Sequence, residues 1–467
     1  MIKEIPVISK RVNGDMPQQE ESHLGEYAVN GRYVYIETYG CQMNVNDSEI
    51  VSGILSQHGY GITEKIEKSD VILLNTCSVR DNAEQKIFKR LENLRHYRKK
   101  NARLVVGILG CMAERLRGKL VGHSDLVSIV VGPDEYRKVP LLLDQAFSGE
   151  QGIAVKLSKV ETYEDIIPLR TQGISAWISI TRGCDKYCTY CVVPYTRGRE
   201  RSRPFPSIIK EISGLWQQGY KEVTLLGQNV NSYIDFDSKI DFAQLLRACA
   251  NEVPEMRIRY TTSHPYDMTD DLIETMAEFK NICNYIHLPV QSGSDKILEK
   301  MNRHYSIEHY KERIRKIKEY MPNCALSTDI ISGFPTETEQ DHQDTLDLMR
   351  EVRYDGAYMF NYSPRERTKA YMMEDDISPE VKRDRLNEII DLQNKISKEL
   401  NIAEHGTIHE VLVETTSKKN ENEWQGRTDT NKVVIFDNSK QLYKTGDLVK
   451  CRITNSTSAT LFGDVCE

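Results

Sequence analysis

Three cysteines, Cys184, Cys188 and Cys191, stand in one short segment with the spacing Cys-x3-Cys-x2-Cys, and we call them the loop triad. Three thiolates at this spacing can hold a cubane 4Fe-4S cluster while one of its irons keeps no protein ligand. Structural zinc takes a closed set of four ligands, and a cluster that only carries electrons usually takes four cysteines. The triad therefore predicts a cluster at which a small molecule can bind iron. The alternative is three buried core thiols.

A second set of cysteines, Cys41, Cys77 and Cys111, is scattered along the chain, and we call it the strand-end triad. Each member follows a predicted strand within a few residues. Gly40 and Gly110 precede the first and the last of them and permit a close backbone approach. The pattern predicts a second three-cysteine cluster with an open iron. The alternative is three independent small core residues.

The N-terminal part of the chain, residues 32–148, alternates apolar strands with helical patterns. Such alternation predicts a parallel, doubly wound α/β sheet with helices on both faces. The carboxyl ends of parallel strands share one edge, so the strand-end triad should converge there. The expected strands are Tyr33–Thr38, Val71–Asn75, Leu104–Leu109 and Val127–Val131, and the expected helices are Asn46–His58, Asp81–Arg98 and Pro133–Phe147. The polar stretch Ser148–Thr171 that follows is expected to be a linker with a short strand at Ile153–Lys156.

A second alternating series, residues 170–402, predicts an open (βα)6 barrel. Ligands of such barrels lie at the carboxyl ends of the strands. The expected strands are Ser175–Thr181, Glu222–Leu226, Arg257–Thr262, Tyr285–Pro289, Leu326–Ile331 and Gly356–Tyr362. The expected helices are Ser207–Gln218, Phe242–Glu252, Asp270–Phe279, Ile307–Tyr320, Glu339–Val352 and Glu380–Leu400.

The C-terminal residues 403–467 change to short strands between polar turns. This pattern predicts a small antiparallel β-barrel, a shape often used to hold oligonucleotides. The expected strands are Val411–Glu414, Glu423–Thr428, Lys432–Phe436, Leu448–Ser456 and Thr460–Val465.

The composition is that of an ordinary globular protein of 467 residues. Its net charge of −7 means that contact with a nucleic acid must come from local basic patches. Eleven cysteines, an odd number, fit reduced thiols and metal ligands better than disulfides. Residues Met1–His23 lack the apolar core of a signal peptide, and no stretch approaches a membrane span. We expect a cytoplasmic monomer without membrane contact.

The remaining cysteines lie in apolar helix or strand contexts, which are typical of core or half-exposed thiols. They are Cys249, Cys283, Cys324, Cys451 and Cys466.

Motifs along nearly the whole chain resemble the radical S-adenosylmethionine methylthiotransferase family. The N-terminal motifs are Thr38-Tyr-Gly-Cys-Gln-Met-Asn44 with Asp47-Ser-Glu49, Asn75-Thr-Cys-Ser-Val-Arg80 and Gly110-Cys-Met112. The central motifs are Arg197-Gly-Arg-Glu-Arg-Ser-Arg203, Leu226-Gly-Gln-Asn-Val-Asn-Ser-Tyr233 and Leu288-Pro-Val-Gln-Ser-Gly-Ser294. The C-terminal barrel resembles the TRAM domain, an RNA- or substrate-binding appendage. Tyr39, where sister enzymes tend to carry leucine, favours the branch that acts on a prenylated adenosine of tRNA.

The resemblance implies methylthiolation of carbon 2 of N6-(dimethylallyl)adenosine at position 37 of tRNA. It implies two 4Fe-4S clusters, so that all six cysteines of the two triads are catalytic and metal-binding residues. The loop cluster binds one S-adenosylmethionine as the radical source, and the strand-end cluster holds the sulfur that another S-adenosylmethionine methylates. The implied partners are the anticodon stem-loop of tRNA and an electron donor such as flavodoxin or ferredoxin.

Two local departures from the family pattern affect turns. Gly-Phe-Pro-Gly-Glu-Thr appears here as Gly333-Phe-Pro-Thr-Glu-Thr338. Tyr-Ser-Pro-Arg-Pro-Gly-Thr appears as Tyr362-Ser-Pro-Arg-Glu-Arg-Thr368. Both departures replace a glycine, so they bear on the geometry of the turns and leave the cysteines untouched.

Polar residues after the strands of the second series are candidates for holding S-adenosylmethionine. The amide side chains can bond its amino group, and the hydroxyl and imidazole groups can reach its ribose. His264 has the alternative of a loop histidine bonded to the backbone. The candidates are Gln228, Asn229, Ser263, His264, Gln291, Asp329 and Gly333.

Basic residues in two places are candidates for RNA contacts. Arginine at alternate positions after the loop triad can bind phosphates, although a charge run is more often a solvated face. Basic residues of the C-terminal barrel can do the same. Trp424 and Phe436 there offer surfaces on which unpaired bases can stack, although core packing is the favoured role of Phe436. The candidates are Arg197, Arg199, Arg201, Arg203, Lys418, Lys419 and Arg427.

Two alternatives to this function stay open from the sequence. The same chemistry can serve another substrate, either threonylcarbamoyl-adenosine in tRNA or a side chain of a ribosomal protein. A third possibility comes from a different class: a non-catalytic iron–sulfur protein that binds RNA.

Overall fold

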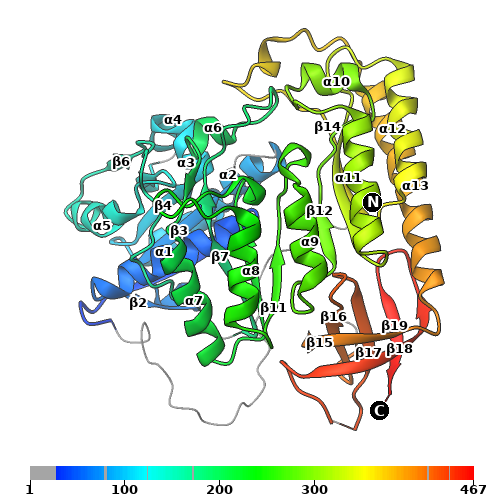
Figure 1. Ribbon diagram of the computed structural model, residues 1–467. Coiled ribbons are helices and arrows are strands. Elements are labelled where there is room, and N and C mark those ends of the chain that lie inside the picture. Colours follow the sequence, from blue (N-terminus) through cyan, green and yellow to red (C-terminus); the bar gives the residue numbers. More distant parts are fainter. Residues whose placement is uncertain are drawn as a thin grey trace. The chain divides into compact units, whose positions relative to one another are not determined.

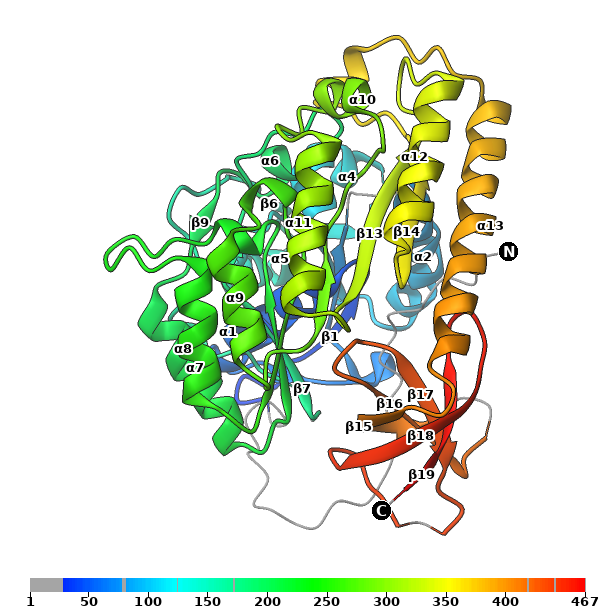
Figure 2. The same ribbon diagram turned by 45° about the vertical axis from the view of Figure 1, so that its right-hand side comes forward.

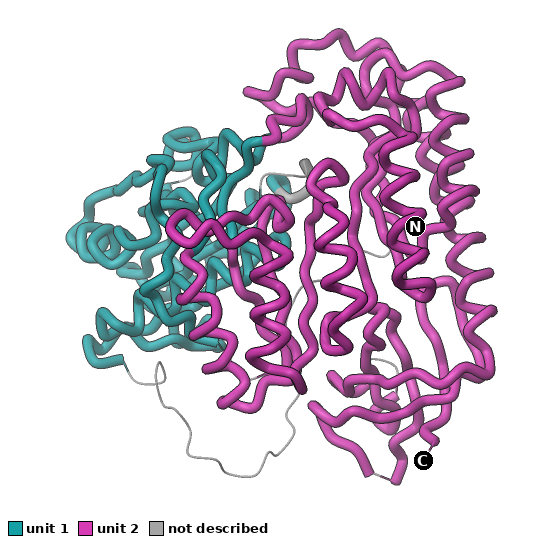
Figure 3. Tube along the Cα trace, viewed as in Figure 1, with its two compact units in different colours: residues 1–172, 181–185, 192–203 teal, residues 173–180, 186–191, 204–467 magenta. Residues whose placement is uncertain are grey.

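A computed structural model of the chain describes residues 28–77, 81–123, 125–170, 173–417, 420–440 and 442–466. The chain forms two compact units (Figure 3). Unit 1 comprises residues 1–172, 181–185 and 192–203, and unit 2 comprises residues 173–180, 186–191 and 204–467. The loop triad is thereby divided, because Cys184 belongs to unit 1 and the other two cysteines belong to unit 2.

Unit 1 is built on a six-stranded sheet in the order β2-β1-β3-β4-β5-β6, in which every neighbouring pair is parallel. This confirms the predicted parallel sheet. The direction of the strand order reverses at β1, which makes its carboxyl end the expected place for a ligand. The strands are β1 (Tyr33–Thr38), β2 (Gly61–Ile62), β3 (Val71–Thr76), β4 (Val105–Gly110), β5 (Val127–Val131) and β6 (Gly152–Ala154).

Helices cover both faces of this sheet (Figure 1). In β3, Val71 and Leu73 pack on the face with α1 and α5, while Ile72 and Leu74 pack on the face with α2, α3 and α4. Alternate residues of a strand point to opposite faces, so the continuous apolar run of β3 fits a doubly wound sheet. The helices are α1 (Gln42–Gln57), α2 (Asp81–Lys100), α3 (Cys111–Leu116), α4 (Gly118–His123), α5 (Val139–Phe147) and α6 (Val193–Thr196).

A two-stranded antiparallel pair, β8 (Thr181–Arg182) with β9 (Arg201–Ser202), also belongs to unit 1. It pairs Arg182 with Arg201 across the two strands. The segments that flank the loop triad are therefore part of unit 1, which the sequence analysis did not predict.

Unit 2 contains the six parallel strands of the predicted open barrel, arranged as β11-β10-β7 and β12-β13-β14. A single parallel bridge between Ile258 and Ile282 links the two sets. The strands are β7 (Ser175–Ser179), β10 (Glu222–Leu226), β11 (Arg257–Tyr260), β12 (Tyr285–His287), β13 (Ala325–Ser332) and β14 (Gly356–Asn361). The helices are α7 (Phe205–Gln217), α8 (Phe242–Glu252), α9 (Asp270–Glu278), α10 (Asp295–Lys300), α11 (Ile307–Tyr320), α12 (Glu339–Val352) and α13 (Pro379–Ala403).

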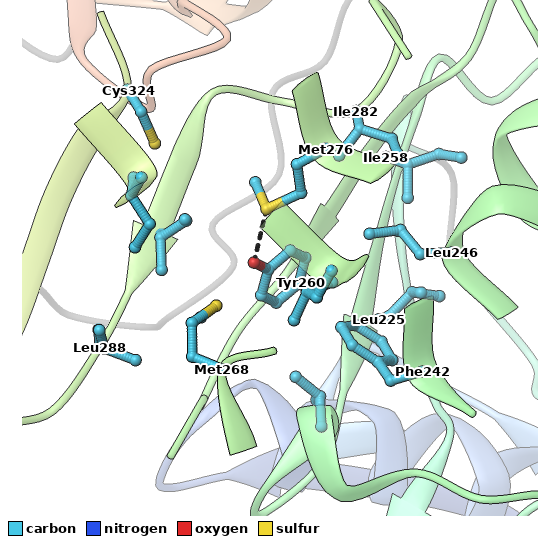
Figure 4. Packing of buried hydrophobic residues seen from close by; sticks show 14 of the residues in the cluster. Leu225, Phe242, Leu246, Ile258, Tyr260, Met268, Met276, Ile282, Leu288 and Cys324 are labelled. Atoms are coloured by element: carbon cyan, nitrogen blue, oxygen red, sulfur yellow. Dashed lines mark hydrogen bonds between the residues drawn. The ribbon is translucent and has the colours of Figure 1, made fainter. Parts of the chain in front are cut away.

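The helices of unit 2 pack their apolar faces on these strands (Figure 4). Helix α8 begins with a capping box, because the Asp241 side chain accepts from the Gln244 amide and the reverse contact is also present. Tyr260 of β11 donates a hydrogen bond to the sulfur of Met276 in α9 at 2.8 Å. Cys324 lies in the same core, and burial raises the pKa of its thiol to about 12. This cysteine is a core residue, as predicted.

The C-terminal strands form a closed barrel in the order β15-β16-β17-β19-β18. The predicted barrel is confirmed, but the expectation that it is antiparallel is wrong for one pair, because β17 and β19 are parallel. The reason is topological: strand directions cannot alternate all the way around a closed ring of five. The strands are β15 (Ile408–Thr416), β16 (Glu423–Arg427), β17 (Val433–Asp437), β18 (Leu448–Ser456) and β19 (Leu461–Val465).

The barrel is joined to the rest of unit 2 by helix α13 and by two arginines of β11. Helix α13 packs beside α12 and β14 before the chain enters β15 (Figure 2). Arg259 pairs with Glu222 and donates to the Asp429 carbonyl at 2.8 Å, and Arg257 donates to the Arg427 carbonyl at 2.9 Å. These charge-assisted bonds satisfy barrel carbonyls from the neighbouring sheet.

The two turns that depart from the family pattern keep a left-handed backbone. Thr336 has φ +71° and Arg367 has φ +74°, at the positions where the family carries glycine. A left-handed conformation costs an L-residue about 1–2 kcal/mol. The geometry of these turns is therefore retained in this chain at the cost of local strain.

None of the helices in the described part of the chain is both long enough and apolar enough to cross a membrane.

Candidate active site

The strand-end triad converges at the carboxyl edge of the sheet in unit 1. Cys41 follows β1 at the start of α1, Cys77 follows β3, and Cys111 opens α3 directly after β4. Strands β1, β3 and β4 are neighbours, so the three thiols lie on one edge. A Cβ on Gly40, which has φ +142°, would lie 2.8 Å from the Cys77 Cβ. The three cysteines therefore follow adjacent strand ends, as the sequence predicts, and their role as cluster ligands stays a prediction.

The chemistry of this donor set fits an iron–sulfur cluster better than a single ion. None of the three cysteines is part of a disulfide. Within the described ranges, no three Cys, His, Asp or Glu side chains are grouped so that they could hold a metal ion. Gly110, with φ +90°, brings the backbone of β4 close to Thr76, where a Cβ would lie 2.5 Å from the carbonyl oxygen.

A buried arginine stands beside this triad. Arg197 follows α6, which packs against α3, and it interacts electrostatically with the thiols of Cys111 and Cys41. Its Nη2 donates to Asp47 Oδ2 at 2.7 Å. Burial raises the pKa of the Cys111 thiol, and the positive charge of Arg197 opposes that rise. The arginine therefore favours the thiolate form that a metal ligand needs.

The part of the loop triad in unit 1 is a tight turn. The Cys184 amide donates to the Gly198 carbonyl at 3.2 Å. Gly183 has φ +79°, and a Cβ there would lie 2.1 Å from the Arg199 carbonyl oxygen. Only glycine fits this position, which fixes the backbone directly before Cys184.

The part of the loop triad in unit 2 is held by residues that follow α10. The Cys191 amide donates to the Cys188 carbonyl at 2.9 Å, and the Thr189 amide donates to the Met301 carbonyl at 3.0 Å. Arg303 donates from Nη1 to the Cys188 sulfur at 3.4 Å and from Nη2 to the Pro289 carbonyl at 2.7 Å. A positively charged donor thus faces one of the predicted cluster ligands.

Three of the candidates for S-adenosylmethionine carry buried polar atoms without a hydrogen-bond partner in the described part of the chain. These atoms are Asn229 Oδ1, Ser263 Oγ and His264 Nε2, at the carboxyl ends of the adjacent strands β10 and β11. Leaving such atoms unpaired in a core is costly. Their placement at the ligand end of the open barrel fits a bound polar molecule.

His264 is a neutral donor in this arrangement. Burial, and after it the charge of Arg303, lowers the pKa of the imidazole well below its usual range. Its Nδ1 accepts from the Tyr266 amide at 3.3 Å, so the proton lies on Nε2, the unpaired atom. The loop-histidine alternative is therefore half right, because one ring nitrogen bonds the backbone and the other stays available.

Asn229 links the candidate site to the cysteine loop within unit 2. Its Nδ2 donates to Asp267 Oδ2 at 2.7 Å, and Lys186 donates to Asp267 Oδ1 at 2.8 Å. Lys186 belongs to the segment between Cys184 and Cys188. This arrangement orients the Asn229 amide and leaves its oxygen as an acceptor.

The remaining candidates occupy the same strand ends. Gln228 follows β10 and is half-buried, and Gln291 has φ +73° beside β13. Asp329 of β13 lies 3.5 Å from His287 and is partly exposed. The Gly333 amide already donates to Glu337 Oε1 at 3.0 Å, and a Cβ there would lie 2.4 Å from Lys382 Cγ. Close packing and a φ of +70° are sufficient to explain why glycine occupies this position.

The arginine run after the loop triad is mostly internal to unit 1. Arg197, Arg201 and Arg203 are buried, and Arg201 pairs with Asp134 at 2.8 Å. The expectation that Arg197 and Arg201 face phosphates is therefore corrected, because buried carboxylates hold both guanidinium groups. Arg199 is exposed and pairs with Asp185 at 2.7 Å, so an RNA contact there stays a prediction.

The C-terminal RNA candidates are less defined. Arg427 of β16 is partly exposed and lies 3.1 Å from Glu414. Lys418 and Lys419 lie outside the described residues. Phe436 is buried in the core of the barrel, as predicted.

Sequence reasoning missed three residues of these sites: Asp47, Arg182 and Arg303. Arg303 follows a helix and gave no signal in the sequence. Asp47 did carry a signal, because it lies on the same helical stripe as Val51 and Ile54, and an acidic residue on an apolar stripe needs a buried partner.

Three family profiles match successive parts of the chain. The uncharacterized protein family UPF0004 matches residues 33–132, the Radical SAM superfamily matches residues 178–349, and the TRAM domain matches residues 403–466. A solved radical S-adenosylmethionine methyltransferase, TsrM from Kitasatospora setae, superposes with a TM-score of 0.54 at 15% identity, covering 71% of this chain and 75% of that one. At this identity the likeness shows the fold alone.

Relatives of much higher identity span almost the entire chain. A tRNA-2-methylthio-N(6)-dimethylallyladenosine synthase of Chloroherpeton thalassium is 53% identical over 451 residues, covering 96% of this chain and 100% of the relative. One of Christiangramia forsetii is 52% identical, covering 94% of each chain. These identities and the three matching profiles show that the chain belongs to the family of tRNA-2-methylthio-N(6)-dimethylallyladenosine synthases.

Proposed function

We propose that this chain methylthiolates carbon 2 of N6-(dimethylallyl)adenosine at position 37 of tRNA. The observation that carries the proposal is the 53% identity over 96% of the chain to a relative named for this product. The chain is then an enzyme, a radical S-adenosylmethionine tRNA methylthiotransferase. Its cofactors are two 4Fe-4S clusters and S-adenosylmethionine, which serves both as methyl donor and as radical source.

The loop triad holds the first cluster in this proposal. Three thiolates leave one iron open for the methionine end of S-adenosylmethionine. A cluster held by Cys184, Cys188 and Cys191 would supply the one-electron reduction of S-adenosylmethionine that this chemistry requires. The chain's own part is to hold Cys188 against Arg303 and to anchor the loop through Thr189, contacts that keep the ligand in place.

The unpaired atoms at the ends of β10 and β11 bind S-adenosylmethionine. Asn229 Oδ1 accepts from its amino group, while Ser263 Oγ and His264 Nε2 bond oxygen atoms of the ligand. The remaining polar contacts to S-adenosylmethionine come from Gln228, Gln291 and Asp329. Since His264 is neutral, its donor role does not change between pH 5 and pH 8.

The strand-end triad holds the second cluster, which supplies the sulfur. Gly40 and Gly110 let neighbouring segments pack closely beside the triad, because a Cβ would lie 2.8 Å from the Cys77 Cβ and 2.5 Å from the Thr76 carbonyl oxygen, respectively. Arg197 and Asp47 lie behind the triad as a charged support. Breaking a C–H bond at an aromatic carbon needs such cofactors, because this C–H is not acidic enough for side-chain acids and bases to act on it.

The organisation and partners follow from the same proposal. We assign residues 32–148 to the domain of the second cluster, residues 170–402 to the radical core and residues 403–467 to a TRAM domain that binds tRNA. The family profiles support these divisions. The electron donor is a flavodoxin or a ferredoxin, and the chain works as a monomer in the cytoplasm, where its tRNA substrate is found.

A substrate assay tests the function. The anaerobically reconstituted chain is given S-adenosylmethionine, a reductant and tRNA that either carries or lacks the dimethylallyl group, and nucleosides are analysed by mass spectrometry. We expect the 2-methylthio product only from prenylated tRNA, together with 5′-deoxyadenosine. Product from threonylcarbamoylated tRNA alone would overturn the substrate assignment. Absence of 5′-deoxyadenosine in every arm would overturn the enzymatic one.

A further inference from the structure

Five of the buried charged side chains of unit 1 have no reacting role in the proposed reaction. They interact in a continuous network beside the strand-end triad, and three are positive and two are negative, so the network carries one surplus positive charge. All five residues belong to unit 1. They are Arg182, Arg197, Arg201, Asp47 and Asp134, each less than 10% exposed.

Asp47 is the centre of this network. Its Oδ1 accepts from Arg182 Nη1 at 2.8 Å, and its Oδ2 accepts from Arg197 Nη2 at 2.7 Å. Tyr136 donates to the same Oδ2 at 3.3 Å. Burial raises the pKa of the Asp47 carboxyl, but the two arginines outweigh it and hold that pKa below its usual range. The carboxylate is therefore ionised, and both its oxygens are used.

Arg197 is only partly satisfied by these contacts. Its Nη2 reaches Asp47 at 2.7 Å and Asn44 Oδ1 at 3.5 Å. Its Nη1 is buried and has no hydrogen-bond partner among the described residues. Cys111 and Cys41 are its neighbours on the triad side. A buried N–H of a charged group without an acceptor is costly, and a side-chain hydrogen bond already links this guanidinium to the Cys111 thiol, so its place beside the thiols points to a sulfur acceptor on the triad side.

The charges of the network and of a three-cysteine cluster are complementary. Three thiolates around a doubly positive cubane core leave one net negative charge. The network offers one surplus positive charge at the same edge of the sheet. A buried ion pair that served stability alone would gain nothing from an unpaired donor and a surplus charge.

We propose that Arg197 binds the cluster of the strand-end triad, donating its unused N–H to a sulfur atom there, and that Asp47 is the positioning residue that holds it. The inference rests on the proposed function, which places a cluster on these cysteines. Asp47 also holds Arg182, which stands two residues before Cys184. One carboxylate therefore fixes both the donor of the second cluster and the backbone that leads into the loop triad.

A redox titration of the second cluster tests this role. In a Cys188→Ala background only the strand-end triad can hold a cluster, so its midpoint potential can be followed by electron paramagnetic resonance without turnover. Arg197→Met removes the charge and the donor, which penalises the more negative reduced state. We expect the equilibrium constant for reduction of the cluster to fall at least about tenfold, which lowers the midpoint potential by ~59 mV for one electron. Arg137→Met is the control: this arginine of unit 1 is 41% exposed and pairs with Glu161 and Asp165.

The outcomes separate this inference from the proposed function. A cluster whose potential is the same in Arg197→Met and Arg137→Met overturns the role of Arg197 and leaves the function intact. No cluster at all in the Cys188→Ala parent overturns the function, and the inference with it. If the Arg197→Met variant holds no iron, the Arg197→Lys variant distinguishes a role in binding the cluster from a merely structural one. A cluster with an intermediate potential supports the proposal, because lysine keeps the charge without the planar fork, whereas loss of iron from both variants makes the residue merely structural and overturns it.

Asp47→Asn tests the positioning step. Arg197 keeps its charge but loses its anchor, so we expect the spectrum of the second cluster to broaden and its potential to move by less than in Arg197→Met. An unchanged spectrum in Asp47→Asn would contradict the positioning role.

Discussion

The two cysteine sites each have a buried arginine beside a thiol, but the two arginines differ in how their charge is balanced. Arg197, beside Cys111, is paired with Asp47 at 2.7 Å. Arg303, beside Cys188, bonds a carbonyl, a tyrosine hydroxyl and the cysteine sulfur, and in the described ranges it forms no ion pair with a carboxylate. The first site holds a carboxylate that balances part of its positive charge, whereas the second has no such carboxylate among the described residues.

This difference indicates that the two sites are organised in different ways. A buried ion pair is expensive to break, because one partner is left charged in a poor solvent. The strand-end site is therefore organised by the folding of unit 1. The Arg303 contacts instead offer a positive charge that an anionic ligand, such as thiolates or the carboxylate of S-adenosylmethionine, completes. Four predictions test this contrast between the two arginines.

The largest effect is expected from removing one cysteine of each triad. Cys188→Ala should abolish 5′-deoxyadenosine, because the radical source loses a ligand. Cys77→Ala should retain 5′-deoxyadenosine and abolish the methylthio product, because only the sulfur source is lost. Both products are measured by mass spectrometry of one reaction mixture. If Cys77→Ala still yields methylthiolated tRNA, the assignment of roles to the two triads is wrong.

The next effect is on stability. Asp47→Asn leaves two buried guanidinium groups without their carboxylate, so the free energy of unfolding should fall by about 3–5 kcal/mol. Urea unfolding of the cluster-free chain, followed by the fluorescence of a probe in unit 1, measures this change. A loss of under about 1 kcal/mol would mean that Arg182 and Arg197 are not held as the contacts indicate.

Removing the other arginine should cost less. Arg303→Met takes away a buried charge that has no carboxylate partner, and the freed Pro289 carbonyl keeps a contact with the Tyr305 hydroxyl at 3.4 Å. We expect the cluster-free chain to lose about 1 kcal/mol or less. Affinity for S-adenosylmethionine, measured on the chain with clusters, should fall severalfold. A stability loss as large as that of Asp47→Asn would show that the two arginines do not differ in how their charge is balanced.

The smallest effect is a pH dependence. The pKa of Asp47 is lower in the folded chain than in the unfolded chain, so its stabilisation is complete above the unfolded value of about 3.9 and is lost as pH falls through the folded value. The difference in stability between the parent and Asp47→Asn should be constant from about pH 5 upward and shrink below about pH 4. The difference for Arg303→Met should stay flat across that window. Measuring both series by urea unfolding checks the sign.

Much of the fold followed from local patterns. Strands such as β1, β5 and β10, and helices such as α8, have the predicted bounds because each places its apolar residues at a regular period between clear end signals. The parallel pair in the C-terminal barrel did not follow, because strand direction in a closed ring depends on the number and order of all its strands. Short elements such as β2 and α6 contain too few residues to show a period.

The sequence alone determined which thiols form the two triads and that the strand-end triad converges, since spacing and strand ends are local properties of the chain. Only the tertiary structure showed that Arg197 is buried against Asp47 and that Arg303 faces Cys188. The physical reason is that a charged residue looks the same in a sequence whether it meets water or a partner. Burial and pairing depend on segments 150 residues apart in one case and 115 in the other, which only the folded chain brings together.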